Sequence, residues 1–169
     1  MIRTSLVISS LALATFGGTA PASQVVHAAP VAGFSWPLQP GPDTIVSDFD
    51  PPQRPWLAGN RGVDLAGVAG EAVHASGAGI VSFAGRVAGV GVVSITSGAL
   101  RTTYEPLQVT IHQGEQVLAG ALIGRLSLAG SHCVPRACLH WGLLRGTDYL
   151  DPLALLGLEH VRLLPLDAL

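Results

Sequence analysis

The 169-residue sequence contains no lysine, so arginine supplies all nine of its strongly basic side chains. The missing lysine excludes Schiff-base catalysis and cofactors that are carried on a lysine amine. Charged residues make up only 12% of the chain and aromatic residues only 5%, whereas hydrophobic residues reach 49%. With a net charge of −2 and no basic stripe to bind a polyphosphate backbone, nucleic acid is not an expected partner.

The sequence also offers little for a membrane span near its N-terminus. The apolar run Leu6–Phe16 is too short to cross a bilayer, which takes about 20 residues. It follows the charged Arg3 and precedes small residues suited to signal cleavage, in Ala20–Ala22 or Val26–Ala28. We therefore expect residues 1–29 to be a secretory signal peptide, with an uncleaved anchor as the alternative, and no membrane span after signal removal.

The remaining chain, about 140 residues, is enough for one domain. Residues 30–58 are rich in proline and turn residues and predict a leader and loop, in which only Ile45–Phe49 has the pattern of a strand. Residues 59–158 form the predicted β domain, and residues 159–169 form a C-terminal tail.

Short β-branched runs separated by glycine dominate the predicted domain. This spacing is typical of an all-β fold, an antiparallel β-sandwich or a partly open barrel. A short C-terminal helix is expected after Asp151, which can cap it, because Pro152 suits the first helical position. The predicted strands are Gly62–Leu65, Ala72–His74, Ile80–Ala84, Val92–Thr96, Arg101–Tyr104, Gln116–Leu118, Leu122–Leu126 and Leu139–Leu143.

The segment Cys138–Gly142 (CLHWG) predicts a buried strand with one polar face. Side chains alternate along a strand, so Cys138 and His140 share a face, about 6.6 Å apart, while Leu139 and Trp141 share the other. Such a pair can form part of a site, or it can be a core histidine beside a disulfide cysteine.

The two cysteines, Cys133 and Cys138, are most simply joined in an exported chain. The alternative is a thiolate zinc ligand, which would need reduced cysteine. If the disulfide forms, Cys138 is not available to a metal and the loop before His140 is closed.

Several segments together resemble the lysostaphin/LytM-type peptidoglycan zinc metallopeptidases. They are Trp36–Leu38 (WPL), Asn60–Ala66 (NRGVDLA), Gly70–Ala75 (GEAVHA), Gly79–Val81 (GIV), Tyr104–Leu107 (YEPL), Gly114–Gly124 (GEQVLAGALIG), Cys138–His140 (CLH) and Asp151–Leu153 (DPL). The resemblance covers about residues 35–156 and implies that family's antiparallel β fold.

The resemblance also implies a metal site with one altered position. Asp64 and His140 stand at two of the family's three zinc-ligand positions, and Asn60 stands at the third, where the family has histidine. A neutral amide is a poor zinc ligand compared with nitrogen, thiolate or carboxylate donors. We therefore expect zinc to be weakly bound or absent.

The family's two assisting histidines are replaced as well, by Pro106 and Cys138. Among residues that could substitute for them, His132 precedes the cysteine loop and could fold back over the site. Glu105 is expected to turn away from the site, because alternation places it opposite the face of Tyr104 and Pro106. His74 and His112 are expected to have packing or surface roles.

The resemblance therefore leaves two main functions for a secreted or cell-wall-associated protein. The first is a non-catalytic module that binds peptidoglycan or regulates a cell-wall hydrolase. The second is an active zinc-dependent peptidoglycan endopeptidase that uses a substitute such as His132. A purely structural role is a third reading, and it gives the inward Asp64 and His140 no task.

Overall fold

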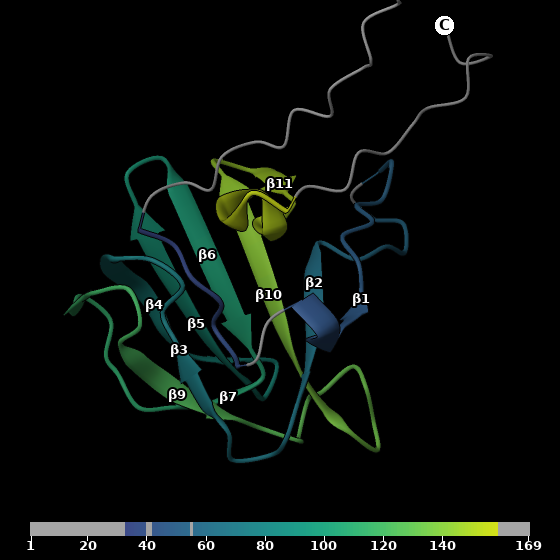
Figure 1. Cartoon of the computed structure of the whole chain (residues 1–169), viewed down its shortest axis with the longest axis horizontal. Helices are drawn as coiled ribbons and strands as arrows, with labels where there is room; N and C mark the ends of the chain where they lie inside the picture. Colours follow the sequence, from purple (N-terminus) through teal and green to yellow (C-terminus); the bar gives the residue numbers. More distant parts are fainter. Residues whose placement is uncertain (1–32, 40–41, 55, 159–169) are drawn as a thin grey trace, which may run out of the picture.

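The computed structural model describes residues 33–39, 42–54 and 56–158, in which eleven strands form two antiparallel sheets (Figure 1). The predicted signal peptide and C-terminal tail lie outside the described residues. The sheets confirm the expected all-β antiparallel fold. They stay open and form no closed barrel within the described residues.

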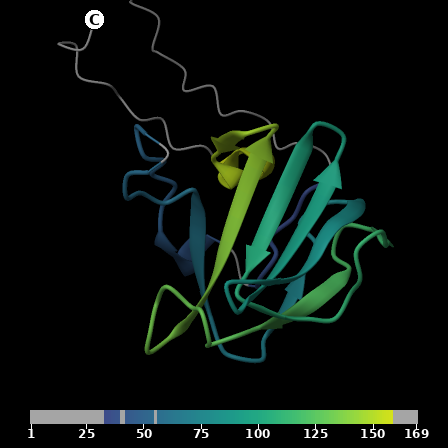
Figure 2. The ribbon, with the colours of Figure 1, turned by 180° about the vertical axis from the view of Figure 1, so that it is seen from behind.

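The large sheet has the strand order β1-β2-β10-β6-β5-β4-β8, and β11 adds to it by pairing with β10. Figure 2 views this sheet from its other side. Its strands are β1 (Ile45–Ser47), β2 (Gly62–Gly67), β4 (Gly79–Val87), β5 (Val90–Ser97), β6 (Leu100–Glu105), β8 (Gln116–Val117), β10 (Ala137–Arg145) and β11 (Asp148–Leu150). The small sheet has the order β3-β9-β7, with strands β3 (Ala72–His74), β9 (Leu122–Leu126) and β7 (Leu107–Val109).

The core lies against one face of the large sheet, and alternation along the central strands determines which side chains enter it. Val63 and Leu65 of β2, and Leu139 and Trp141 of β10, are all fully buried. Burying each such apolar side chain contributes roughly 1.5–3 kcal/mol. The residues between them, including Asp64, therefore point to the opposite face of the sheet.

Tyr104 of β6 is the main polar group of this core and is fully buried. Its hydroxyl accepts from the Ser76 amide at 2.9 Å and donates to Thr102 Oγ1 at 2.9 Å, and it lies 2.6 Å from Ser76 Oγ. Burial raises the pKa of Tyr104, and the hydrogen bonds that its hydroxyl makes with Ser76 and Thr102 oppose that shift in part. The hydroxyl is thus a satisfied part of the core.

The strand predictions hold for each named run, with differences at the ends. β7 and β11, of three residues each, were not predicted. β1 lies inside the predicted proline-rich loop and pairs with β2, so this segment completes the sheet edge.

The expected C-terminal helix is present as a short 3₁₀ helix, η2 (Pro152–Leu156). Asp151 caps it by accepting from the Leu153 amide at 2.9 Å, and Gly157 ends it with a positive φ of 70°. A second 3₁₀ turn, η1 (Pro42–Thr44), leads into β1. Among the described residues, no helix is long and apolar enough to cross a bilayer.

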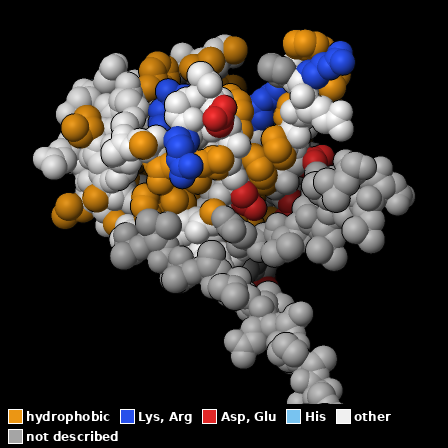
Figure 3. Space-filling view, turned by 90° about the horizontal axis from the view of Figure 1, so that it is seen from above, with side chains coloured by type: hydrophobic (Ala, Val, Ile, Leu, Met, Phe, Trp, Pro, Cys, Tyr) orange, Lys and Arg blue, Asp and Glu red, His pale blue; other side chains and the backbone are white. Residues whose placement is uncertain are grey.

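Charged side chains are sparse on the outside of the molecule. On the face seen in Figure 3, arginine side chains lie apart from one another among apolar and acidic ones. The described part of that face therefore has no continuous basic stripe, in line with the low charge of the sequence.

Candidate functional site

A row of three polar side chains crosses the large sheet on the face opposite the core. His140 of β10 lies directly opposite Asp64 of β2 and Glu105 of β6. Directly paired residues point to the same face, with Cβ atoms about 4.5–5.5 Å apart. Since Leu139 and Trp141 fill the core, His140 and its two partners face the other side.

Asp64 and His140 are in direct contact although 76 residues separate them in the sequence. His140 Nδ1 lies 2.9 Å from Asp64 Oδ1, and the two side chains are only 13% and 8% exposed. The structure thus brings together the two residues that stand at family ligand positions. Their role as metal ligands stays a prediction.

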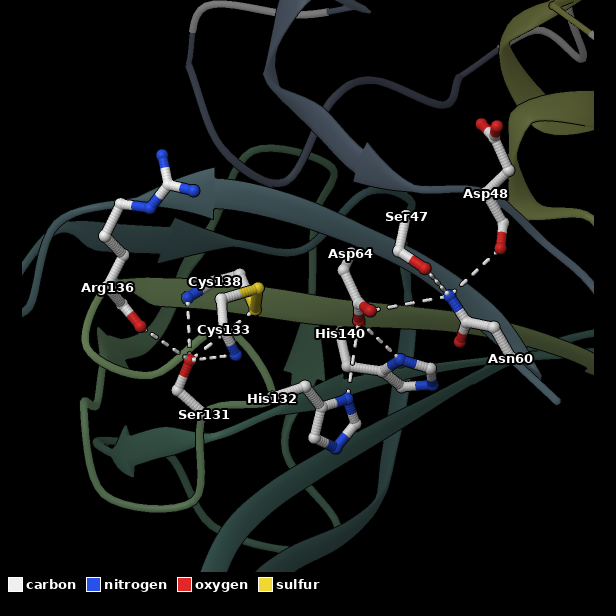
Figure 4. Close-up of polar contacts among 10 residues, drawn as sticks. All are labelled: Ser47, Asp48, Asn60, Asp64, Ser131, His132, Cys133, Arg136, Cys138 and His140. Carbon is white, nitrogen blue, oxygen red and sulfur yellow. Dashed lines mark hydrogen bonds and ion pairs between the residues drawn. A yellow bond between two sulfur atoms is a disulfide. The ribbon is translucent and has the colours of Figure 1, made fainter. Parts of the chain in front are cut away.

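His132 completes a three-residue cluster with this pair (Figure 4). Its Nδ1 lies 3.6 Å from the same Asp64 oxygen, and its ring centroid lies 5.3 Å from that of His140. One ligand atom from each of the three residues lies within 4.8 Å of the others. The His132 side chain is 54% exposed, so the cluster opens to solvent on that side.

The chemistry of this cluster suits zinc. Catalytic zinc sites use three protein ligands drawn from histidine nitrogen, carboxylate oxygen and thiolate, and leave a fourth position open. With ligand bonds of about 2.0–2.2 Å, tetrahedral donors lie roughly 3.3 Å apart. The two separations from Asp64 Oδ1, 2.9 and 3.6 Å, bracket that value, and all three candidate donor atoms lie within 4.8 Å of one another. One carboxylate and two imidazoles therefore fit the ion that the resemblance implies.

Asn60 lies beside the cluster, and its two shortest hydrogen bonds run to residues outside it. Its amide nitrogen donates to Ser47 Oγ and to the Asp48 carbonyl oxygen, both at 3.0 Å. It also reaches Asp64 Oδ2 at 3.5 Å. The amide is thus a hydrogen-bond donor between β1 and Asp64.

The loop before β10 holds His132 from both sides. The predicted disulfide between Cys133 and Cys138 is present. Ser131 Oγ accepts from the backbone amides of Cys133 at 3.2 Å and Cys138 at 3.1 Å, and it donates to the Arg136 carbonyl oxygen at 3.1 Å. Residues on either side of His132 are therefore tied to the start of β10.

Pro106 and Cys138, the positions at which the resemblance implies assisting histidines, carry no proton-transfer group. Cys138 is buried and disulfide-bonded, and Pro106 has no titratable side chain. Glu105, by contrast, lines the groove beside His140, so the expectation that it turns away from the site was wrong. The predicted alternation with Tyr104 is correct, but Tyr104 is the residue that enters the core. The pairing of Glu105 with His140 would have revealed this, and pairing register is a tertiary feature.

The cluster sits at one end of a groove of about 750 Å³ over the large sheet. Ser94 of β5 and Thr103 of β6 line its floor. The rest of the groove is lined by two arginines, Arg61 and Arg101, and by the apolar side chains of Phe83, Val87, Val92 and Leu144. Such a groove can hold an extended chain with both polar and apolar parts.

His74 and His112 lie away from the cluster. His74 is on β3 in the small sheet. His112 lies on the surface, with Nδ1 2.8 Å from Glu115 Oε1, and its hydrogen bond lowers the pKa of the Glu115 carboxyl. Neither histidine belongs to the Asp64, His132 and His140 cluster.

Comparison with known proteins agrees with this architecture. The model of peptidase family M23 matches residues 58–152. The uncharacterized protein Rv2891 of Mycobacterium tuberculosis is 44% identical over 140 residues, which cover 80% of this chain and 56% of that protein. The chain thus spans just over half the length of the curated relatives it matches.

Two solved structures share the fold. Helicobacter pylori Csd3 is 30% identical with a TM-score of 0.59, and the match covers 75% of this chain and 36% of that one. A zinc-containing peptidase from Vibrio cholerae has a TM-score of 0.61 at 22% identity, covering 74% of this chain and 40% of that one. The second likeness shows the fold alone.

Proposed function

Because the chain belongs to peptidase family M23, we propose that it is an exported domain whose groove binds the peptide part of peptidoglycan at the cell wall. The observation that carries this proposal is the groove itself, which has the Asp64, His132 and His140 cluster at one end. The family model matches residues 58–152, which include the three neighbouring strands β2, β10 and β6 that carry the groove residues Asp64, His140 and Glu105.

The dimensions of the groove suit a short extended peptide. Glu105 lies at the cluster end of β6, and Arg101 lies four residues away on the same face of that strand, roughly 13 Å distant. A bound peptide of about four residues would span that length. At the far end, the Arg101 guanidinium would pair with a peptide carboxylate, a group that arginine binds well.

We further propose that the domain binds this peptide without efficient cleavage. General acid–base assistance typically contributes 10²–10⁴-fold to a hydrolytic rate. The positions where the family supplies that assistance hold Pro106 and the disulfide-bonded Cys138. A bound peptide would therefore meet a site without the usual proton donors and acceptors, which suits a binding or hydrolase-regulating role.

A second candidate function, an active zinc-dependent endopeptidase, is favoured by the position of Glu105. Its carboxylate lines the groove directly opposite His140, where it could take a proton from an attacking water. Zinc, when bound by Asp64, His132 and His140, would lower the pKa of its water to about 7 and polarise the peptide carbonyl. Glu105 would then replace the missing histidines.

One experiment separates these functions. Purified protein is sedimented with insoluble peptidoglycan, and the released fragments are measured by mass spectrometry with and without a chelator. Retention without release supports the binding module, and release that a chelator stops supports the endopeptidase. If the protein is not retained and releases no fragments, both candidates are overturned.

A matched pair of variants tests the groove in the same assay. Arg101→Ala is expected to weaken retention, because it removes the carboxylate partner at the far end of the groove. Arg145→Ala removes an exposed arginine at the end of β10 that does not line the groove, and it should leave retention unchanged.

A further inference from the structure

We propose that this chain has moved its third metal ligand from position 60 to His132, so that its metal-binding set is Asp64, His132 and His140. The proposal concerns metal binding alone and does not depend on whether peptidoglycan is bound. It replaces the expectation that two ligands and a weak amide donor make up the site.

The first support is the way the two oxygens of Asp64 are used. Both imidazoles approach Oδ1, with His140 Nδ1 at 2.9 Å and His132 Nδ1 at 3.6 Å. Asn60 approaches the other oxygen, Oδ2, at 3.5 Å. The two imidazole nitrogens therefore share Oδ1 as the candidate third donor, and Asn60 contacts Oδ2 instead.

The second support is the orientation of the Asn60 side chain. Its amide nitrogen, which cannot bind a metal, contacts the residues around the cluster. An amide nitrogen carries two hydrogens and acts as a donor only. Here it donates to Ser47 Oγ and the Asp48 carbonyl oxygen of the neighbouring segment at 3.0 Å each. Its contact with Asp64 would orient the carboxylate, as partners behind metal ligands commonly do.

The third support is the anchoring of His132. Cys133 is covalently joined to Cys138, two residues before His140, so a single disulfide connects the neighbourhoods of both histidines. Ser131 Oγ binds the amides of both cysteines from the other side of His132. Because the loop is already ordered, little further conformational entropy is lost when His132 binds an ion.

The test measures zinc affinity of the oxidised protein by competition with a chromophoric chelator. Cobalt(II) absorption reports the coordination of the substituted ion. We expect one zinc per chain. Loss of a residue that only orients a metal ligand weakens metal binding by roughly 10–100-fold. We expect His132→Ala to weaken zinc binding by more than that. Asn60→Ala should weaken binding within that range. His112→Ala, which removes an exposed histidine elsewhere, should have no effect.

A rescue variant separates lost ligation from lost folding. Asn60→His combined with His132→Ala should recover tight binding and the cobalt spectrum, because it supplies the missing imidazole nitrogen from position 60, which lies beside Asp64. Zinc binding by His132→Ala equal to that of the unmodified protein would overturn the proposal. So would an unmodified protein that binds no zinc. Peptidoglycan retention is measured separately, so a result that overturns this metal site neither supports nor overturns the proposed peptidoglycan binding.

Discussion

At the scale of single residues, the site depends on a carboxylate that is nearly buried. Asp64 is 5% exposed, and an isolated buried charge is strongly unfavourable. Its two oxygens have polar neighbours on both sides, His140 and Asn60. These contacts offset the cost of burying the Asp64 carboxylate on the groove face of the sheet, which is opposite the apolar core.

Asn60→His is expected to tighten zinc binding without restoring cleavage. Histidine nitrogen is a better zinc donor than an amide, and position 60 lies beside Asp64. Pro106 and the disulfide-bonded Cys138 would still supply no proton transfer, so peptide release should stay near background. Calorimetric zinc titration and a peptidoglycan digest check the two parts. Strong cleavage by this variant would show that Glu105 or another group already provides the assistance.

Tyr104→Phe is expected to lower the free energy of unfolding by about 1–3 kcal/mol, because it leaves buried polar partners unsatisfied. The Ser76 amide would lose its acceptor, and Thr102 would lose its donor. Urea denaturation of both proteins measures the difference. An unchanged midpoint would mean that water or a shifted side chain satisfies these groups.

The same residue predicts a loss of stability at alkaline pH. Burial raises the folded-state pKa of Tyr104, so above about pH 10 the unfolded chain releases a proton that the folded chain retains. Stability from this residue is present below that pH and falls as pH rises through it. The stability difference between the unmodified protein and Tyr104→Phe should therefore shrink above pH 10, measured by denaturation at several pH values. A constant difference would contradict this.

At the scale of elements, the central strands approach so closely that an added Cβ would clash at two of their glycines. A Cβ on Gly62 would lie 2.4 Å from the Trp141 carbonyl oxygen and 2.9 Å from His140 Nε2. A Cβ on Gly142 would lie 2.5 Å from Thr103 Oγ1. These glycines leave space on the groove face beside His140, and they keep β2, β10 and β6 in close register there.

Replacing both cysteines by serine is expected to weaken zinc binding by about 10-fold, the order found when a positioning partner of a ligand is lost. Without the disulfide between Cys133 and Cys138, His132 would sample more orientations before it binds. Chelator competition on the double variant measures the effect, with the circular dichroism spectrum as the control for folding. Affinity equal to that of the unmodified protein would show that the Ser131 hydrogen bonds suffice.

At the scale of the whole molecule, one open sheet provides both the core and the site. The small sheet and η2 pack on one face of the large sheet, and the groove occupies the other. An exported chain would also meet the oxidising conditions in which its disulfide forms.

Export itself is predicted to remove between about 22 and 29 residues from the N-terminus. Expression of the full chain in a secreting bacterial host, followed by intact-mass measurement of the exported protein, checks this. The mass should correspond to a start near residue 23 or 30, and alkylation should change it only after reduction. A full-length mass in the membrane fraction would favour the uncleaved anchor.

The sequence by itself determined the features that follow from local order along the chain. Alternation in residues 138–142 placed His140 opposite the core-facing Leu139 and Trp141, and glycine spacing predicted the strands. The short spacing of the two cysteines in a chain expected to be exported predicted their disulfide, which is present. Motif resemblance paired Asp64 with His140.

Tertiary structure alone decided which residues stand around that pair. Whether Asn60 or His132 shares the cluster depends on the path of a closed loop, and loop paths have no period in the sequence. Whether Glu105 or Tyr104 faces the groove depends on how β6 registers against β10, since a shift of one residue exchanges the two faces of a strand. Contacts between distant segments set both outcomes, because packing apolar side chains into one core selects the register.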